Sequence, residues 1–178
     1  MEPGEALSAA GQIAVALAGF AGVVVAFRSR SLHEWSPVDK FRLLNLLGNS
    51  LVALAACLFG MLLLTIKPTP LSIWRWGSGF SLFLGVFYAF LGRQRLSELG
   101  SNAIKELGAF GYVFYVIGVL GVAVGLLQVY NALVSGVFWL FYTSITFQLA
   151  VGALQFARMI FQPPHTSKTN GTTTNRHE

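Results

Sequence analysis

The fold is decided between Leu107 and Ala157, where the sequence reads LGAFGYVFYVIGVLGVAVGLLQVYNALVSGVFWLFYTSITFQLAVGALQFA without a charged residue. One straight helix of that length would run about 75 Å, against a bilayer core of about 30 Å. The chain must therefore turn back. Asn, Ser and Gly gather at Asn131–Gly136, which is typical of a tight turn. We predict spans over 110–130 and 137–161; four spans in total would require 110–130 to be re-entrant.

Three further apolar stretches precede this pair, over 6–27, 43–66 and 76–92. Each approaches the roughly 20 apolar residues that a membrane-spanning helix needs. The first has acidic residues before it and Arg28 after it, whereas a cleaved signal peptide begins with basic residues. We therefore predict that this stretch is retained, which gives five spans.

The composition places the chain in lipid. Of its 178 residues, 54% are hydrophobic and 11% are charged, whereas a soluble domain carries about 25% charged residues. The predicted fold class is all-α, a polytopic transmembrane helical bundle formed by residues 1–161. Pro163-Pro164 ends the last helix, and the polar residues 162–178 are predicted to be a disordered cytoplasmic tail.

The basic residues predict the orientation of the bundle. With five spans, ten lie on one side and two, Lys67 and Arg75, on the other. Positive charge is retained in the cytoplasm, so we expect the N-terminus outside and the C-terminus inside. Four spans would put the tail on the side with fewer basic residues. The ten are Arg28, Arg30, Lys40, Arg42, Arg93, Arg95, Lys105, Arg158, Lys168 and Arg176.

Small and polar residues recur at helical spacing within the spans. Such residues replace the hydrophobic drive between membrane helices, through close approach and hydrogen bonds. Amides that face lipid cost several kcal/mol, so we expect those of the first, second and fifth spans to face inward. We call these residues the polar seam. It consists of Gln12, Asn45, Asn49, Ser144, Gln148 and Gln155.

Two interpretations of the polar seam remain open. In the first, the seam joins helices by hydrogen bonds and leaves no void. In the second, it lines a wet cavity or solute path between the first, second and fifth helices. Asn45, Asn49, Gln148 and Gln155 would pair with one another in the first case and line a continuous cavity in the second.

Signals for chemistry are weak. No ionisable residue lies deep in a span, which argues against proton-coupled transport. His33 and Glu34 lie near Asp39 in the first connection, and their convergence would be needed for an enzyme acting on lipid headgroups. Cys57 is the one cysteine and is predicted to be a small buried hydrophobe. We predict no catalytic, metal or cofactor site.

The net charge of +5 is explained by topology and by anionic headgroups rather than by nucleic-acid binding.

The stretch GFAGVVVAFR, Gly19–Arg28, and the stretch WSPVDKFRL, Trp35–Leu43, resemble a family of small uncharacterised bacterial inner-membrane proteins. The resemblance covers about the first 50 residues. It implies a bacterial cytoplasmic membrane and transfers no functional residue.

The leading functional hypothesis is a non-catalytic membrane protein that acts through helix packing with itself or with a membrane partner. The alternative is a channel or facilitator with an uncharged polar path along the second and fifth helices. A lipid-headgroup enzyme comes third.

Overall fold

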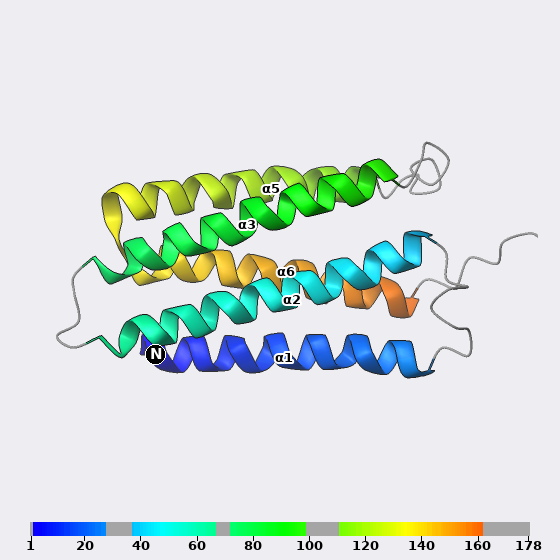
Figure 1. The fold of residues 1–178 in the computed structure, drawn as a ribbon, viewed down its shortest axis with the longest axis horizontal. Coiled ribbons are helices and arrows are strands. Elements are labelled where there is room, and N and C mark those ends of the chain that lie inside the picture. Colours follow the sequence, from blue (N-terminus) through cyan, green and yellow to red (C-terminus); the bar gives the residue numbers. More distant parts are fainter. Residues whose placement is uncertain (1, 28–36, 67–71, 99–110, 162–178) are drawn as a thin grey trace, which may run out of the picture.

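A computed structural model of the chain describes residues 2–27, 37–66, 72–98 and 111–161 (Figure 1). The described elements are α1 (Pro3–Phe27), α2 (Pro37–Leu64), α3 (Ile73–Glu98), α5 (Gly111–Tyr130), a π-helical turn η3 (Asn131–Ser135) and α6 (Phe138–Phe161). The all-α class is confirmed.

Each predicted span coincides with one long helix. The second helix begins at Pro37, and proline is preferred at the first position of a helix.

Successive helices run antiparallel, so the chain starts at one end of the bundle and α6 finishes at the other (Figure 1). We call these the N-terminal end and the Arg158 end. The η3 turn lies at the N-terminal end. Among the described basic residues, Arg75 lies there, whereas the other five lie toward the Arg158 end: Lys40, Arg42, Arg93, Arg95 and Arg158.

The tightest packing joins α1, α2 and α6. Its core includes Leu7 and Ala14 from α1, Ala53 from α2 and Phe141 from α6, all without exposed surface. A Cβ on Gly60 of α2 would lie 2.9 Å from Leu7 Cδ1 and 3.0 Å from Phe141 Cε1. Cys57 is buried in this core, which confirms the sequence prediction.

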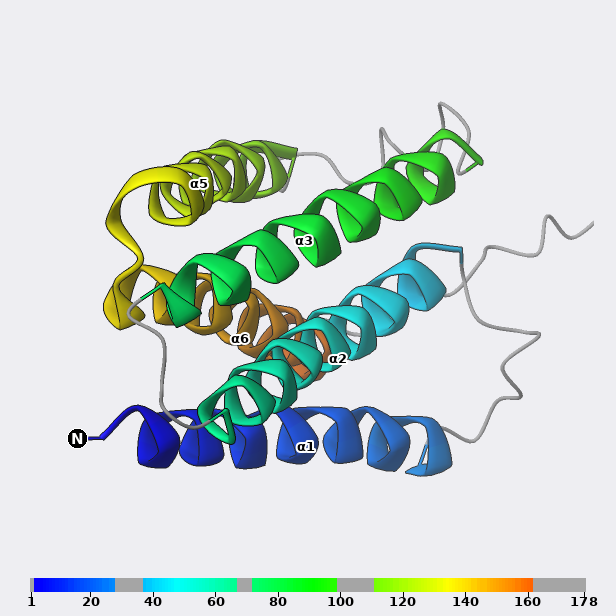
Figure 2. The same ribbon diagram turned by 60° about the vertical axis from the view of Figure 1, so that its left-hand side comes forward.

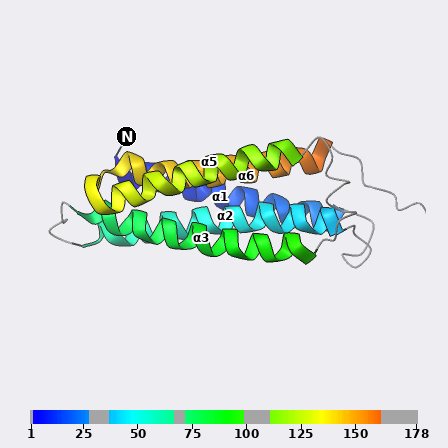
Figure 3. The same ribbon diagram turned by 90° about the horizontal axis from the view of Figure 1, so that it is seen from above.

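Helices α3 and α5 complete the bundle (Figure 2), and fewer of their described residues are buried than in α1, α2 and α6. In its most apolar window, α5 buries 11% of its residues, against 44% for α2. Viewed from above, α5 lies along α6 and α3 lies along α2; α3 and α5 are closest near η3 and further apart at their other ends (Figure 3).

Four of the described helices are long and apolar enough to cross a membrane: α1, α2, α5 and α6. The chain is therefore described as a multi-pass membrane protein. α3 has 26 residues, or about 39 Å of helix, but its glycines, serines and tryptophans lower its hydropathy. The crossing by α3 stays a prediction.

The predicted break at Asn131–Gly136 is a true reversal of the chain. Gly136 has φ 66°, a left-handed conformation that side chains disfavour, and its N–H donates to the Asn131 carbonyl at 2.9 Å. Small residues do not always mark a helix contact: a Cβ on Gly22, Gly85, Gly92 or Gly118 would meet nothing within 4 Å. The tail 162–178 and the residues His33 and Glu34 lie outside the described residues.

Candidate functional site

Five of the six polar-seam residues line one cavity of about 400 Å³ between α2, α3, α5 and α6. We call it the amide cavity. Its remaining wall is mostly apolar, and none of the described residues that line it is charged. The polar side chains on its wall are Asn45, Asn49, Ser81, Tyr88, Gln128, Ser144, Gln148 and Gln155.

The fold does not place Gln12 beside the other five polar-seam residues. It lies exposed on α1 and is absent from the wall of the cavity. The cavity was expected between the first, second and fifth helices, but α1 packs too closely on α2 and α6 to leave room. The cavity lies instead between α2 and α6 on one side and α3 and α5 on the other. Glycines of α3 and α5 line it and leave space because they have no side chain.

Toward the Arg158 end, a hydrogen-bonded cluster joins α2 to α3. The Tyr88 hydroxyl donates to Asn45 Oδ1 at 3.0 Å, and Asn49 Nδ2 donates to the Asn45 carbonyl at 2.7 Å. A longer bond of 3.4 Å runs from Asn49 Nδ2 to the Tyr88 hydroxyl. Here the amides join helices, as the first interpretation of the seam predicted.

At the N-terminal end, Asn131 joins α3 to α6. Its Nδ2 donates to Ser78 Oγ at 2.7 Å and to the Val137 carbonyl at 3.0 Å, while its Oδ1 accepts the Val137 N–H at 2.8 Å. Asn131 has no exposed surface. The sequence placed Asn131 in a turn and gave no sign of its contact with Ser78, because 53 residues separate the two.

One helical turn further into the bundle lie Ser81 and Gln128. Ser81 follows Ser78 by three residues in α3, and Gln128 precedes Asn131 by three residues. Because α3 and α5 are antiparallel, the contact between Ser78 and Asn131 places Ser81 and Gln128 at the same level of the bundle. Both are buried, and both line the amide cavity.

Three of the residues that line the cavity each carry a buried polar atom without a hydrogen-bond partner in the described part of the chain: Ser81 Oγ, Gln128 Oε1 and Gln155 Oε1. Gln128 Nε2 donates to the Leu140 carbonyl at 2.7 Å, which fixes the orientation of this amide. A buried polar atom left without a partner costs about 1–3 kcal/mol.

The mouth of the amide cavity lies between α3 and α5. Four of its lining residues, Val86 and Ala89 on α3 and Gly118 and Val122 on α5, are exposed on the outside of the bundle. All four lie in the middle of their helices, well away from the ends. The mouth therefore faces the side of the bundle and neither of its ends.

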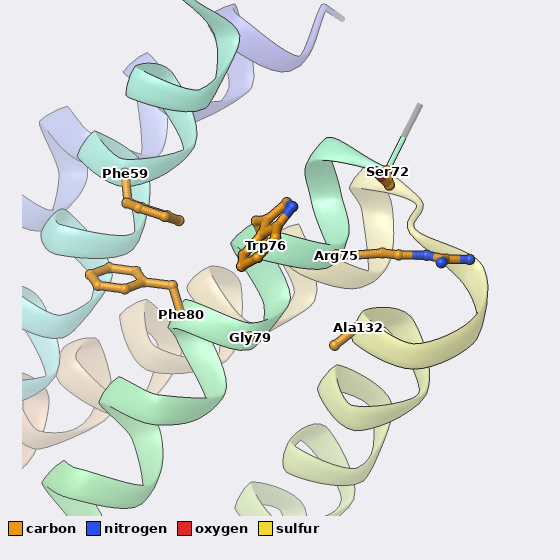
Figure 4. Close-up of a pocket in the computed structure, with 7 residues that line it drawn as sticks. All are labelled: Phe59, Ser72, Arg75, Trp76, Gly79, Phe80 and Ala132. Atoms are coloured by element: carbon orange, nitrogen blue, oxygen red, sulfur yellow. The ribbon is translucent and has the colours of Figure 1, made fainter. Parts of the chain in front are cut away.

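A second hollow of about 660 Å³ lies near the N-terminal end, between α2, α3 and the start of η3 (Figure 4). Phe59 and Phe80 stack there with ring centroids 4.1 Å apart. Arg75 extends toward the α5–α6 turn, where Nη2 donates to the Val134 carbonyl at 2.7 Å. This hollow contains none of the polar-seam residues.

Two arginines that the charge count assigned to the cytoplasmic side are buried at the Arg158 end. Arg42 on α2 is 4% exposed and Arg158 on α6 is 8% exposed. Both lie within a few turns of a helix end, so the deep part of the described spans holds no charged side chain.

Comparison of the chain with protein-family models, with curated proteins and with solved structures found no match.

Proposed function

We propose that this protein is a non-catalytic membrane protein that binds a small uncharged molecule in the amide cavity. The observation that carries the proposal is the convergence of five polar-seam residues on one cavity. A volume of about 400 Å³ lies within the range of about 300–1,000 Å³ typical of small-molecule sites.

The occupant is uncharged because the described wall offers nothing to neutralise a charge. A buried ion needs a counter-charge or several polar ligands to offset the loss of its hydration. The wall has amides and hydroxyls but no acid or base.

Passage across the membrane is a second candidate function. The cavity extends along α6 from Ser144 to Gln155, about 16 Å at 1.5 Å per residue, with Gln148 between them. That is about half of a bilayer core of about 30 Å. A facilitator would use these polar side chains as successive hydrogen-bonding stations.

Helix packing with itself or with a membrane partner, the leading hypothesis from the sequence, accounts for part of the seam. The Asn45, Asn49 and Tyr88 cluster fits it, since those groups pair with one another. It leaves the space of about 400 Å³ beside the seam without an explanation, and we therefore favour ligand binding.

We further propose that α3 is a fifth crossing, with the N-terminal end outside and the Arg158 end in the cytoplasm. The excess of described basic residues at the Arg158 end supports this orientation. The resemblance of the first 50 residues supports a bacterial cytoplasmic membrane.

Photolabelling with an uncharged alkyl diazirine that lacks hydrogen-bond donors tests the proposed binding. In lipid nanodiscs, we expect adducts on the cavity-wall residues Phe147 and Val151 as well as on lipid-facing residues such as Val119 and Leu126. Peptide mass spectrometry locates the adducts. Adducts confined to lipid-facing residues would contradict the proposal.

A filled cavity provides the control for this experiment. A Cβ on Gly121 would lie 3.6 Å from Phe147 Cε1, so Gly121→Phe places a ring in the cavity. We expect it to remove the adduct on Val151 and to keep those on lipid-facing residues. Gly19→Phe is the matched variant, because Gly19 has nothing within 4 Å of its Cβ position; it should leave all adducts unchanged.

A further inference from the structure

The polar-seam residues that line the amide cavity differ in what their side chains contact. The two asparagines of α2 form hydrogen bonds with one another and with α3. Ser144 Oγ donates to a carbonyl of its own helix at 2.8 Å, and Gln155 has almost no exposed surface. Gln148 differs from all of these, because it is partly exposed and its amide forms no hydrogen bond with any described residue.

The position of Gln148 on α6 shows where its exposed surface lies. Residues three and four positions apart lie beside one another on a helix. Those that surround Gln148 in this way are buried: Ser144, Ile145, Val151 and Gly152. Gln148 therefore lies at the centre of the inward face of α6, and its exposed surface faces the cavity that it lines.

Gln148 also lies deep in the bundle. It is about 15 Å along α6 from Phe138 and about 20 Å from Phe161, at 1.5 Å per residue. At that depth the medium around a membrane-spanning helix is hydrocarbon, in which an amide without a hydrogen bond is costly. A ligand that pairs with Gln148 must bring its polar group to the same depth. This requirement excludes charged molecules and lipids whose headgroups stay at the membrane surface.

The mouth of the cavity lies at a comparable depth. It opens between α3 and α5 beside exposed residues such as Val86 and Val122. A Cβ on Gly118, which also lines the cavity, would meet nothing within 4 Å. A molecule that dissolves in the hydrocarbon of the bilayer can therefore reach the cavity from the side.

We propose that Gln148 is the residue that recognises the ligand of the amide cavity, and that this ligand is a neutral, bilayer-soluble molecule with a hydroxyl or amide group. The Gln148 amide donates through Nε2 and accepts through Oε1, so it pairs with either group. The inference rests on the proposed binding function and specifies the residue and the ligand class that give it selectivity.

Two alkyl diazirines of equal chain length, one ending in a hydroxyl group and the other in a methyl group, test the proposal. In lipid nanodiscs, the adducts on Val151 are divided by those on the lipid-facing residues Val119 and Leu126, which corrects for the amount of each probe in the bilayer. We expect this ratio to be about three- to tenfold higher for the hydroxyl probe, as for one hydrogen bond inside a membrane protein. Equal ratios would overturn the proposal.

Variants locate the residue responsible for this preference. Gln148→Met keeps a side chain of similar length without the amide. It should lower the ratio for the hydroxyl probe about three- to tenfold, to that of the methyl probe. Gln12→Met, on the exposed surface of α1, should keep the preference. If Gln148→Met does not fold, Gln148→Ala removes the amide without adding a new group. An unchanged preference in a folded variant of Gln148 would contradict the assignment.

Entry from the side has its own variant pair. Gly118→Trp places a large side chain at the mouth, and Gly19→Trp places the same side chain on α1 at a position equally free of neighbours. We expect Gly118→Trp to remove the Val151 adducts of both probes and Gly19→Trp to retain them. Retained adducts in Gly118→Trp would overturn entry between α3 and α5.

The outcomes separate this inference from the proposed function. Adducts on Val151 from both probes in equal ratios would leave the cavity as a binding site and overturn recognition by Gln148. The absence of such adducts with either probe would overturn the binding function and this inference with it.

Discussion

At the scale of single residues, Asn131 forms hydrogen bonds through both the NH₂ group and the oxygen of its side-chain amide. The amide donates twice and accepts once, and its three partners belong to α3 and to the first residue beyond Gly136. The Val137 carbonyl also accepts the Phe141 N–H, at 3.5 Å. Because the site is fully buried, removing the amide leaves a hydroxyl and a backbone N–H without partners.

We therefore predict that Asn131→Leu lowers the free energy of unfolding by about 2 kcal/mol or more, on the basis of roughly 0.6–1 kcal/mol for each hydrogen bond between membrane helices. Steric trapping in bicelles measures this quantity. Gln12→Leu, which makes the same kind of change at an exposed position, should stay within about 0.5 kcal/mol of the unaltered protein. An equally small effect at Asn131 would show that the three hydrogen bonds do not hold the turn.

At the scale of elements, the contact between α2 and α3 depends on a glycine. A Cβ on Gly48 would overlap the ring of Tyr88 and lie 2.6 Å from its hydroxyl. The ring therefore lies flat on α2, which brings the hydroxyl to Asn45 and Asn49. The sequence offered no reason to pair Gly48 with Tyr88, because forty residues separate them and neither belonged to an expected stripe.

Gly48→Ala should displace Tyr88 and lower the free energy of unfolding by about 1–3 kcal/mol, the usual cost of overpacking. Gly19→Ala is the control, since its Cβ meets nothing within 4 Å and alanine favours a helix by up to about 1 kcal/mol. Adding Gly48→Ala to Tyr88→Phe should cost less than in the unaltered protein. Full additivity of the two changes would disprove the coupling.

The elements also show how far the sequence could reach. Charge-free length and flanking arginines predicted all five long helices, because these properties are local to each segment. Five polar-seam residues were predicted to share an inward face, and they do share the cavity. Gln12 differs because helical spacing identifies a helix face but not the neighbouring helix that covers it. Tyr88 and Gln128 were missed for the same reason.

At the scale of the whole molecule, the bundle has a close-packed part and an open part. Helices α1, α2 and α6 form the close-packed core, while α3 and α5 cover the amide cavity with few buried residues of their own. Glycines on α5 leave space where that helix faces the cavity, because they have no side chain. The close-packed helices therefore form a fixed wall of the cavity, and the cavity opens at the side of the bundle between α3 and α5.

We proposed that α3 is a fifth crossing, and labelling from each side of the membrane tests this number of crossings and its orientation most directly. In a Cys57→Ala background, single cysteines at Ser135 and at Lys168 are treated with a membrane-impermeant maleimide. We predict that Ser135→Cys reacts from outside and that Lys168→Cys reacts only from the cytoplasmic side, because α6 lies between them. A third cysteine, Glu2→Cys, should react from the same side as Ser135→Cys, because four crossings including α3 lie between these two positions. Reaction of Glu2→Cys and Ser135→Cys from opposite sides would mean that α3 does not cross and would contradict the five-crossing bundle.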